Sequence, residues 1–324
     1  VLDPPIRVSN CIYTTTNMVK HCFLTACVAA VMLACSPGRQ AKGGDNLSYE
    51  ALKQRIDSII TGKPGQFGIA LIVDGRDTVT VNNSDDYPLM SMFKLHEAIG
   101  VCHMLDTRGI GLDSVMAIDR AQLDPDTWSP MLKEHRSRKI SQPIGRLIDY
   151  TLIDSDNNAS NLLFDSIASV AYADSLVDAL IPGRGFRLIW RESDMKADHR
   201  RAYDNVTSPL AYASLVSRVF TDSIVSEEKQ NHIKNAMLRC NTGMSRLAAP
   251  LVSEKGVMFG HRTGSGYVNE RGEIVAVNDG GFVTLPSGKS YAIVVLVKDY
   301  AGPQEDAEAV MAEISKAVYD YITK

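Results

Sequence analysis

The chain has 324 residues, of which 45% are hydrophobic and 22% are charged, and its formal net charge is −4 at pH 7. This balance is typical of a globular protein with a large core, and the slight acidic excess argues against a nucleic-acid partner. Four of the six cysteines lie within the first 35 residues, which excludes a disulfide scaffold. The other two, Cys102 and Cys240, either pair in an oxidising compartment or remain buried thiols.

The first 35 residues carry the pattern of an export signal. Met18 to His21 is a basic segment, Cys22 to Leu33 is apolar but too short to span a membrane, and Ala34 is a small residue at a cleavage point. We therefore expect a signal over residues 18–35 and a periplasmic protein. Residues 1–17 fit no targeting pattern and are expected to be upstream translated sequence. The end of the signal also resembles a lipoprotein cleavage box, so Cys35 is a candidate lipid anchor.

Regular elements follow the leader. Leu47 to Ile60 has apolar residues on one helical face, and Phe67 to Asp74 and Thr78 to Asn83 have the composition of strands. A mainly helical region is then expected from Ser91 to about Arg246.

The first motif is Ser91-Met92-Phe93-Lys94, at the start of a helix-like stretch that runs to Leu105. A serine at a helix N-terminus meets free backbone N–H groups and the positive end of the helix dipole, which favour a developing oxyanion. Lys94 lies one turn later, where it can act as a base beside the hydroxyl. The same spacing occurs at two other places in the chain, so an ordinary core helix with an N-cap serine is the alternative for this motif taken alone.

The second motif, Ser155-Asp156-Asn157, lies between two helical segments. Asp and Asn are common helix caps, so one interpretation is a plain N-cap for the helix that starts near Asn158. The functional interpretation gives Ser155 a proton-carrying hydroxyl and Asn157 an amide that holds a substrate amide.

The third motif, Arg262-Thr263-Gly264, lies in a strand-like segment and is expected to expose a cation along the strand's edge. Arginine stays charged at any working pH and can bind a carboxylate through two nitrogens. Glycine there lets a ligand approach the backbone closely. A surface charge on a twisted edge strand is the alternative. Further strands are expected from Glu273 to Leu285 and from Tyr291 to Lys298, and a closing helix from Glu305 to Ile322.

Together, in this order, the three motifs resemble those of the class A serine β-lactamases, over about Leu47 to Lys324. The resemblance implies an α+β fold: a five-stranded antiparallel sheet flanked by N- and C-terminal helices, with an inserted all-helical lobe. It implies an α/β lobe from residues 36–90 and 247–324 and a helical lobe from residues 91–246, with the catalytic cleft between them.

The resemblance also assigns roles to individual residues. Glu192 takes the place of the glutamate that activates the hydrolytic water, on a stretch from Pro182 to about Ser208 that is expected to lack regular structure. The backbone N–H groups of Ser91 and Ser265 would form the oxyanion hole. The implied catalytic residues are Ser91, Lys94, Ser155 and Glu192, and the implied substrate-binding residues are Asn157, Arg262, Thr263, Gly264, Ser265 and Trp128.

Several positions depart from the family pattern. Arg262 replaces a lysine, which keeps the charge but removes a group able to release a proton. Lys196 replaces an asparagine that commonly helps to hold the water, and we expect its side chain to point to solvent. Trp190 and Asn205 replace the usual arginine–aspartate pair beneath the loop. Met195 to Asp198 and Leu123 to Met131, which contains Trp128, look like the subgroup that includes cephalosporinases of anaerobic bacteria.

The sequence therefore predicts hydrolysis of a small β-lactam through an acyl-enzyme on Ser91, with a preference for cephalosporins. No cofactor and no metal are expected, and we expect a monomer. A D-alanyl-D-alanine peptidase and a slowly deacylating penicillin-binding or sensor protein are the alternatives, and Glu192 favours the hydrolase. Whether Lys94 or Glu192 is the base of acylation stays open.

Overall fold

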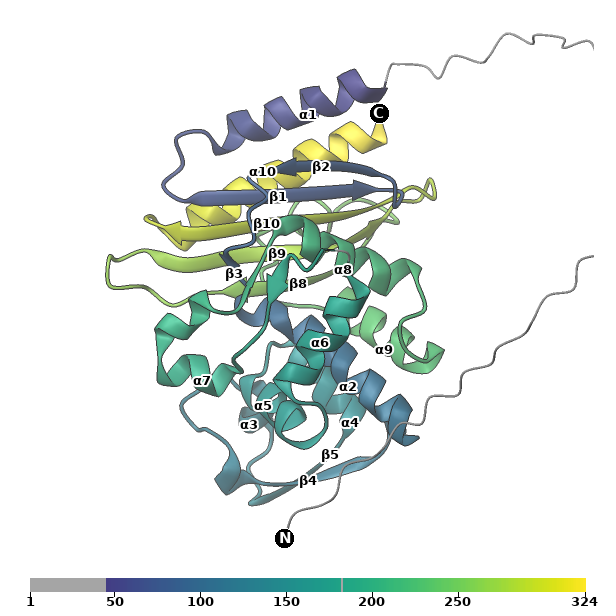
Figure 1. Ribbon diagram of the computed structural model, residues 1–324, viewed down its shortest axis with the longest axis vertical. Coiled ribbons are helices and arrows are strands. Elements are labelled where there is room, and N and C mark those ends of the chain that lie inside the picture. The colour runs from purple at the N-terminus through teal and green to yellow at the C-terminus, as the bar shows by residue number, and fades with distance from the viewer. Residues whose placement is uncertain (1–44, 182) are drawn as a thin grey trace, which may run out of the picture. The chain divides into compact units, whose positions relative to one another are not determined.

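Five antiparallel strands form the central sheet of this computed structural model, which describes residues 45–181 and 183–324, with side chains from residue 49 onward (Figure 1). The strands in spatial order are β2 (Asp77–Val81), β1 (Gln66–Val73), β10 (Ser290–Tyr300), β9 (Ile274–Thr284) and β8 (Met258–Ser265). The α+β fold that the sequence predicts is confirmed.

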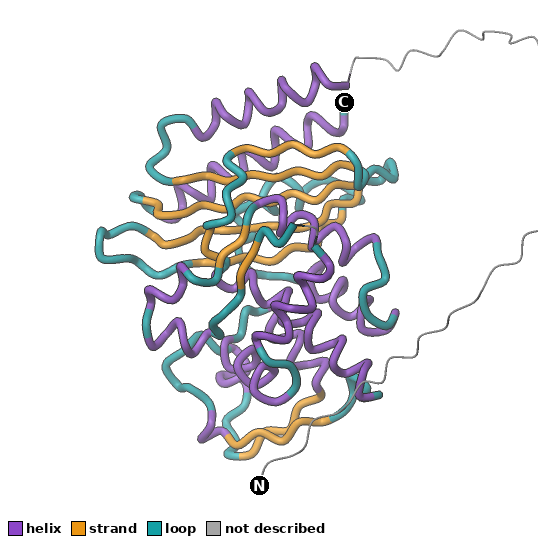
Figure 2. The backbone as a smooth tube through the Cα atoms, viewed as in Figure 1, coloured by secondary structure: helices purple, strands orange, loops and turns teal. Residues whose placement is uncertain are grey.

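Each face of this sheet is covered by helices (Figure 2). Helices α1 (Asp45–Ile60) and α10 (Gln304–Thr323) pack on one face. Ile293 and Val295 of β10 enter the core beneath these helices, whereas Val294 and Leu296 enter the core on the other face. Because successive side chains of a strand point to opposite faces, a strand buried on both sides needs the unbroken apolar run that β10 has.

Most of the helices lie between the first strands and β8, on the other face of the sheet. They are α2 (Lys94–Arg108), α3 (Pro130–Glu134), α4 (Ile144–Ile153), α5 (Asn157–Ser166), α6 (Val170–Leu180), α7 (Glu192–Ala197), α8 (Pro209–Thr221) and α9 (Glu227–Leu238). Three 3-10 turns accompany them: η1 (Met90–Phe93), η2 (Arg120–Gln122) and η3 (His199–Tyr203).

Helix α2 is the centre of this region and packs against α4, α5, α6 and α9. Its apolar residues, such as Leu95, Ile99 and Leu105, are buried. Its first turn is buried too, so that Lys94 and Glu97 lie in the interior. A charge in such a place is stable only when other groups pair with it.

The predicted terminal helices and sheet strands are present, with ends within two residues of those expected. Two small sheets were not predicted: β4 (Val115–Asp119) with β5 (Lys139–Pro143), and β3 (Tyr87–Pro88) with β7 (Val206–Thr207) and β6 (Phe186–Arg187). The expectation of an irregular stretch up to Ser208 was wrong, because β6, α7, η3 and β7 lie within it. Strands β3, β6 and β7 have two residues each, too few to leave a periodic pattern in the sequence.

The expected leader, including Cys35, lies outside the described residues. Cys102 and Cys240 are both free thiols and both buried, so the two do not pair. No helix in the described part of the chain is long and apolar enough to cross a bilayer. The described residues lie in one compact unit, and the division into two lobes stays a prediction.

Candidate active site

Ser91 lies in the 3-10 turn η1, directly before α2, and not in the first turn of the α-helix itself. Met90 before it adopts a left-handed conformation, with φ of 45°, which costs a residue with a side chain about 1–3 kcal/mol. The sheet holds this turn in place. Asn278 of β9 is fully buried and donates from Nδ2 to the carbonyl oxygen of Pro88 at 2.7 Å. At Gly264 of β8, an added Cβ would lie 2.6 Å from the carbonyl oxygen of Leu89, so only glycine allows this approach.

The ammonium group of Lys94 is fully buried and contacts polar groups of both the first and the second motif. Its Nζ lies 3.1 Å from Ser91 Oγ, 2.6 Å from Asn157 Oδ1, and 3.0 and 3.3 Å from the carbonyl oxygen and Oγ of Ser155. Glu192 Oε1 is 2.9 Å away. An ammonium has only three hydrogens, so these five oxygens share them. Burial lowers the pKa of Lys94, and the Glu192 carboxylate opposes that shift.

The second motif is both a helix cap and part of the site. Asp156 is the N-cap of α5 and accepts the backbone N–H of Ala159 at 2.9 Å. Ser155 before it adopts φ of 61°, a strained left-handed conformation that turns the chain toward Lys94. Asn157 begins α5 and donates from Nδ2 to Thr127 Oγ1 at 2.9 Å, which fixes its carbonyl oxygen on Lys94. The two interpretations of this motif are therefore compatible.

Glu192 is the first residue of α7 and only 4% exposed. Its Oε1 accepts a hydrogen bond from Ser91 Oγ at 2.7 Å. The loop before it is fastened by Asn205, whose Oδ1 accepts the N–H groups of Ile189 and Trp190 at 2.8 and 2.9 Å, and whose Nδ2 donates to the carbonyl oxygen of Trp190 at 2.6 Å. Asn205 thus holds the loop through backbone contacts in place of an ion pair.

The side chain of Lys196 does not simply extend into solvent as expected. It is 38% exposed, and its Nζ pairs with Asp124 Oδ2 at 2.5 Å. This pairing lowers the pKa of Asp124. The ammonium of Lys196 is therefore held by a carboxylate other than Glu192.

Arg262 lies on β8, an edge strand as expected, but the expectation that it exposes a cation was wrong: the side chain is fully buried. Its Nη2 donates to Ser155 Oγ at 2.6 Å, and its Nε and Nη1 have no hydrogen-bond partner among the described residues. Beside it, Thr263 Oγ1 lies 2.5 Å from Thr242 Oγ1. Arg262 thus acts on the site from behind the strand, through Ser155.

A second buried arginine, Arg246, was missed by the sequence reasoning. Its Nη2 donates to Ser265 Oγ at 2.7 Å, and its Nη1 donates to the carbonyl oxygens of Gly264 and Asn278 at 3.1 and 2.7 Å. Glu308 of α10 balances the charge, with Oε1 at 3.1 Å from Nε. Arg246 therefore holds the end of β8 and orients the Ser265 hydroxyl. No local pattern marks it, because its partners come from three distant segments.

A cavity of about 370 Å³ brings most of the predicted site residues to one surface. Trp128 forms part of its wall, is 54% exposed and donates from Nε1 to the carbonyl oxygen of Asp154 at 2.8 Å. Lys94, Arg262 and Gly264 lie behind this lining. The lining residues are Met90, Ser91, Trp128, Ser155, Asn157, Glu192, Thr242, Thr263, Ser265 and Tyr267.

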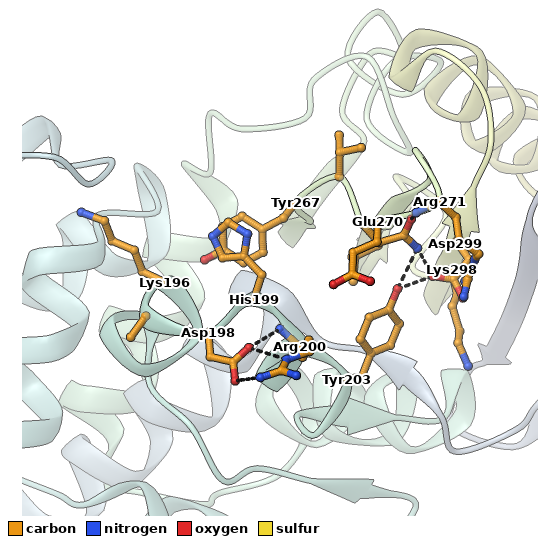
Figure 3. A pocket seen from close by; sticks show the side chains of 14 residues that line it. Lys196, Asp198, His199, Arg200, Tyr203, Tyr267, Glu270, Arg271, Lys298 and Asp299 are labelled. Atoms are coloured by element: carbon orange, nitrogen blue, oxygen red, sulfur yellow. Dashed lines mark hydrogen bonds and ion pairs between the residues drawn. The ribbon is translucent and has the colours of Figure 1, made fainter.

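Tyr267 also lines a second, larger cavity of about 790 Å³ between α7, η3 and the segment after β8 (Figure 3). The ring of His199 stacks on that of Tyr267, with ring centroids 3.7 Å apart and an angle of 5° between the ring planes. On the far side, Tyr203 donates to Asp299, and Arg271 pairs with Asp299 at 3.3 Å. Tyr267 lines both cavities, whereas His199 lines only the larger one.

Comparison with known proteins agrees with this geometry. Residues 51–322 match the model of the beta-lactamase enzyme family. A beta-lactamase of Phocaeicola vulgatus is 46% identical over 84% of each chain, and the extended-spectrum beta-lactamase PER-1 of Pseudomonas aeruginosa is 29% identical over 84% of this chain and 88% of that one. A class A beta-lactamase structure from Bacteroides cellulosilyticus has a TM-score of 0.80 at 29% identity and covers 85% of this chain and 98% of its own.

The chain therefore belongs to the beta-lactamase enzyme family and, within it, to the class A serine β-lactamases. It is a hydrolase that opens β-lactams and gives resistance to them.

The hydrogen bonds from Asn205 to the loop before Glu192 lead to a first prediction. Asn205→Ala leaves the partly buried N–H groups of Ile189 and Trp190 without their acceptor, a loss of about 2 kcal/mol in the loop that carries Glu192. We expect release of the hydrolysed product to slow at least tenfold, while attachment to the enzyme changes little. Mass spectrometry of the reacting enzyme separates the two steps.

Asn83 offers a matched control, because its Oδ1 also accepts a backbone N–H, that of Leu210 at 2.8 Å, but in an exposed contact that does not involve Ile189 or Trp190. Asn83→Ala should release product at the native rate. Release of product by Asn205→Ala at the native rate would show that the loop does not depend on the hydrogen bonds of Asn205.

Proposed function

We propose that Ser91 attacks the β-lactam carbonyl and carries the acyl group. Its Oγ bonds to the carbonyl carbon, and the ring C–N bond breaks. Ser155 gives its proton to the leaving nitrogen and regains one from the Lys94 ammonium 3.3 Å away. The observation that supports this best is the position of Ser91 Oγ, in contact with both Lys94 Nζ and Glu192 Oε1.

The Ser91 proton has two acceptors in reach, a neutral Lys94 at 3.1 Å and the Glu192 carboxylate at 2.7 Å. Once Oγ is esterified it no longer donates to Glu192. The carboxylate then takes a proton from water, the water oxygen attacks the ester carbon, and Ser91 leaves with a proton restored. This second task distinguishes a hydrolase from a D-alanyl-D-alanine peptidase or a sensor that stays acylated.

The remaining residues bind the substrate in this proposal. Backbone N–H groups of Ser91 and Ser265 stabilise the oxyanion, and the hydroxyls of Thr263 and Ser265 hold the ring carboxylate. Arg262 contributes its charge from behind β8, since it is buried against Ser155. Asn157 presents its amide to the acylamino side chain, and Trp128 forms a wall of the cavity.

We also propose cephalosporins as the preferred substrates, with the acylamino substituent passing Tyr267 into the second cavity (Figure 3). The cavity's size and its shared wall with the catalytic pocket support this. So do the names of similar enzymes, among them PER-1 and TLA-3, each called an extended-spectrum beta-lactamase.

Export to the periplasm, a lipid anchor at Cys35 and a monomeric state also remain proposals. The composition of residues 18–35 supports the first two.

The nucleophile and the deacylating base are tested together. Ser91→Ala should show no covalent labelling by a penicillin in mass spectrometry. Glu192→Gln should be labelled yet accumulate the acyl-enzyme, because it keeps its shape but cannot accept the water's proton. Labelling of Ser91→Ala, or native turnover by Glu192→Gln, would contradict these roles.

The second cavity gives a prediction about specificity. Ala197 is exposed and lines that cavity, so Ala197→Trp should fill part of it. We expect KM for cephalosporins with a bulky acylamino substituent to rise about tenfold, about 1.4 kcal/mol, with little change for those with a small one. Ala121→Trp, on an exposed turn elsewhere, is the control. An equal rise for both substrates would rule out this use of the cavity.

A further inference from the structure

Glu97 is a buried carboxyl group that the reaction above does not use. It lies three residues after Lys94 on α2, so the two side chains share a face of that helix. The side chain is fully buried, Oε2 accepts a hydrogen bond from Ser160 Oγ at 2.5 Å, and Oε1 has no hydrogen-bond partner in the described part of the chain. A buried carboxyl group with only one hydrogen-bonded oxygen destabilises the fold, so we expect it to serve a function.

The contact between Glu97 and Ser160 lies between helices α2 and α5. Asn157 and Ser160 are three residues apart on α5, as Lys94 and Glu97 are on α2, and the two helices pack together. Two polar contacts cross this interface, Lys94 with Asn157 at 2.6 Å and Glu97 with Ser160 at 2.5 Å. The Glu97–Ser160 contact therefore lies one helical turn further along both helices than the Lys94–Asn157 contact.

The charged groups that act on Glu97 come from its own helix and from two other elements. The charged groups that act on it are Lys94 on its own helix, Glu192 of α7 and Arg262 of β8. Its neighbour His96 is also fully buried, and burial lowers the pKa of that imidazole to about 3, which keeps it neutral. Two cations and one carboxylate thus act on Glu97, and Asp156 is a further buried carboxylate on which Lys94 acts.

We propose that Glu97 is a positioning residue that controls the charge on Lys94, and through it the rate of acylation, without touching the substrate. The proposal rests on the role of Lys94 given above. When Glu97 is a neutral acid, the buried site favours a Lys94 that gives up its proton. When Glu97 ionises, its carboxylate holds that proton on Lys94.

The pH range follows from the surroundings of Glu97. Burial raises the pKa of Glu97 to about 8, while the hydrogen bond from Ser160 and the charge of Lys94 partly oppose this. Burial likewise lowers the pKa of Lys94, and Glu97 is one of the groups that raise it again. Glu97 therefore titrates on the alkaline side of neutrality, and its titration is coupled to that of Lys94.

Glu97→Gln tests the proposal, because glutamine keeps the shape and can still accept the hydrogen bond from Ser160 but cannot ionise. The measurement is the rate of Ser91 acylation by a chromogenic cephalosporin, followed by stopped flow from acid to alkaline pH. We expect the alkaline-side inflection to move to lower pH by about one unit, because Lys94 then loses its proton without a second carboxylate beside it. The inflection moves to lower pH in either case. If neutral Lys94 is the base, the rate rises at a lower pH, and if the ammonium is needed, the rate falls at a lower pH.

Ser160→Ala is the complementary variant, since it removes the hydrogen bond but keeps the ionisable group. It should move the inflection less than Glu97→Gln does. A Glu97→Gln profile that superimposes on the native one would overturn the proposal. So would a loss of rate in both variants at every pH with no movement of the inflection, which would show that Glu97 only joins the two helices.

Acylation of the native enzyme distinguishes a failure of the proposed role of Glu97 from a failure of the proposed mechanism. Native enzyme that is not acylated at Ser91 would contradict the proposed mechanism, and the role of Glu97 with it. Native acylation at Ser91 with an unmoved inflection in Glu97→Gln would overturn the role of Glu97 alone.

Discussion

The site depends on one buried positive charge. Lys94 has no contact with solvent, and such an ammonium is tolerated only because oxygens from three separate segments surround it. Those segments carry Ser91, Ser155 with Asn157, and Glu192. The need to satisfy one lysine therefore brings together residues up to 101 positions apart, the separation of Ser91 and Glu192. Removing any one partner leaves the charge less well compensated.

Rigid parts of the fold hold this arrangement against strain. Met90 and Ser155 adopt left-handed conformations, with φ of 45° and 61°, and each lies beside a reacting group. The sheet supports the first through Asn278 and through the close approach of Gly264. The cap at Asp156 supports the second, since its carboxylate fixes the start of α5. The strain is local, whereas the contacts that offset it come from the whole core.

Much of the fold could be predicted because periodic patterns are local. The run along β10 and the apolar face of α10 each determine an element within a short window. The three motifs likewise identified Ser91, Lys94 and Asn157 as neighbours, since each motif is contiguous and their order is informative. The structure agrees, with Lys94 in contact with both of the others.

What the sequence could not show is how distant polar residues pair. Arg246, Asn205 and Glu97 look like surface residues in a sequence, yet each has most of its partners on another segment. Arg262 was expected at an exposed edge for the same reason, because burial of a charge depends on neighbours that local composition does not reveal. Polar residues in the interior are where the prediction was weakest and where the site is built.

The central claim is that the Lys94–Glu192 ion pair assembles this site, and a double-mutant cycle on the free energy of unfolding tests it most directly. The variants are Lys94→Met, Glu192→Gln and the two combined. Each single change leaves the other group buried without its partner, so we predict that the double variant is destabilised less than the sum of the two, by about 2 kcal/mol. Losses that simply add would contradict the account, because they would mean that the two groups do not depend on each other.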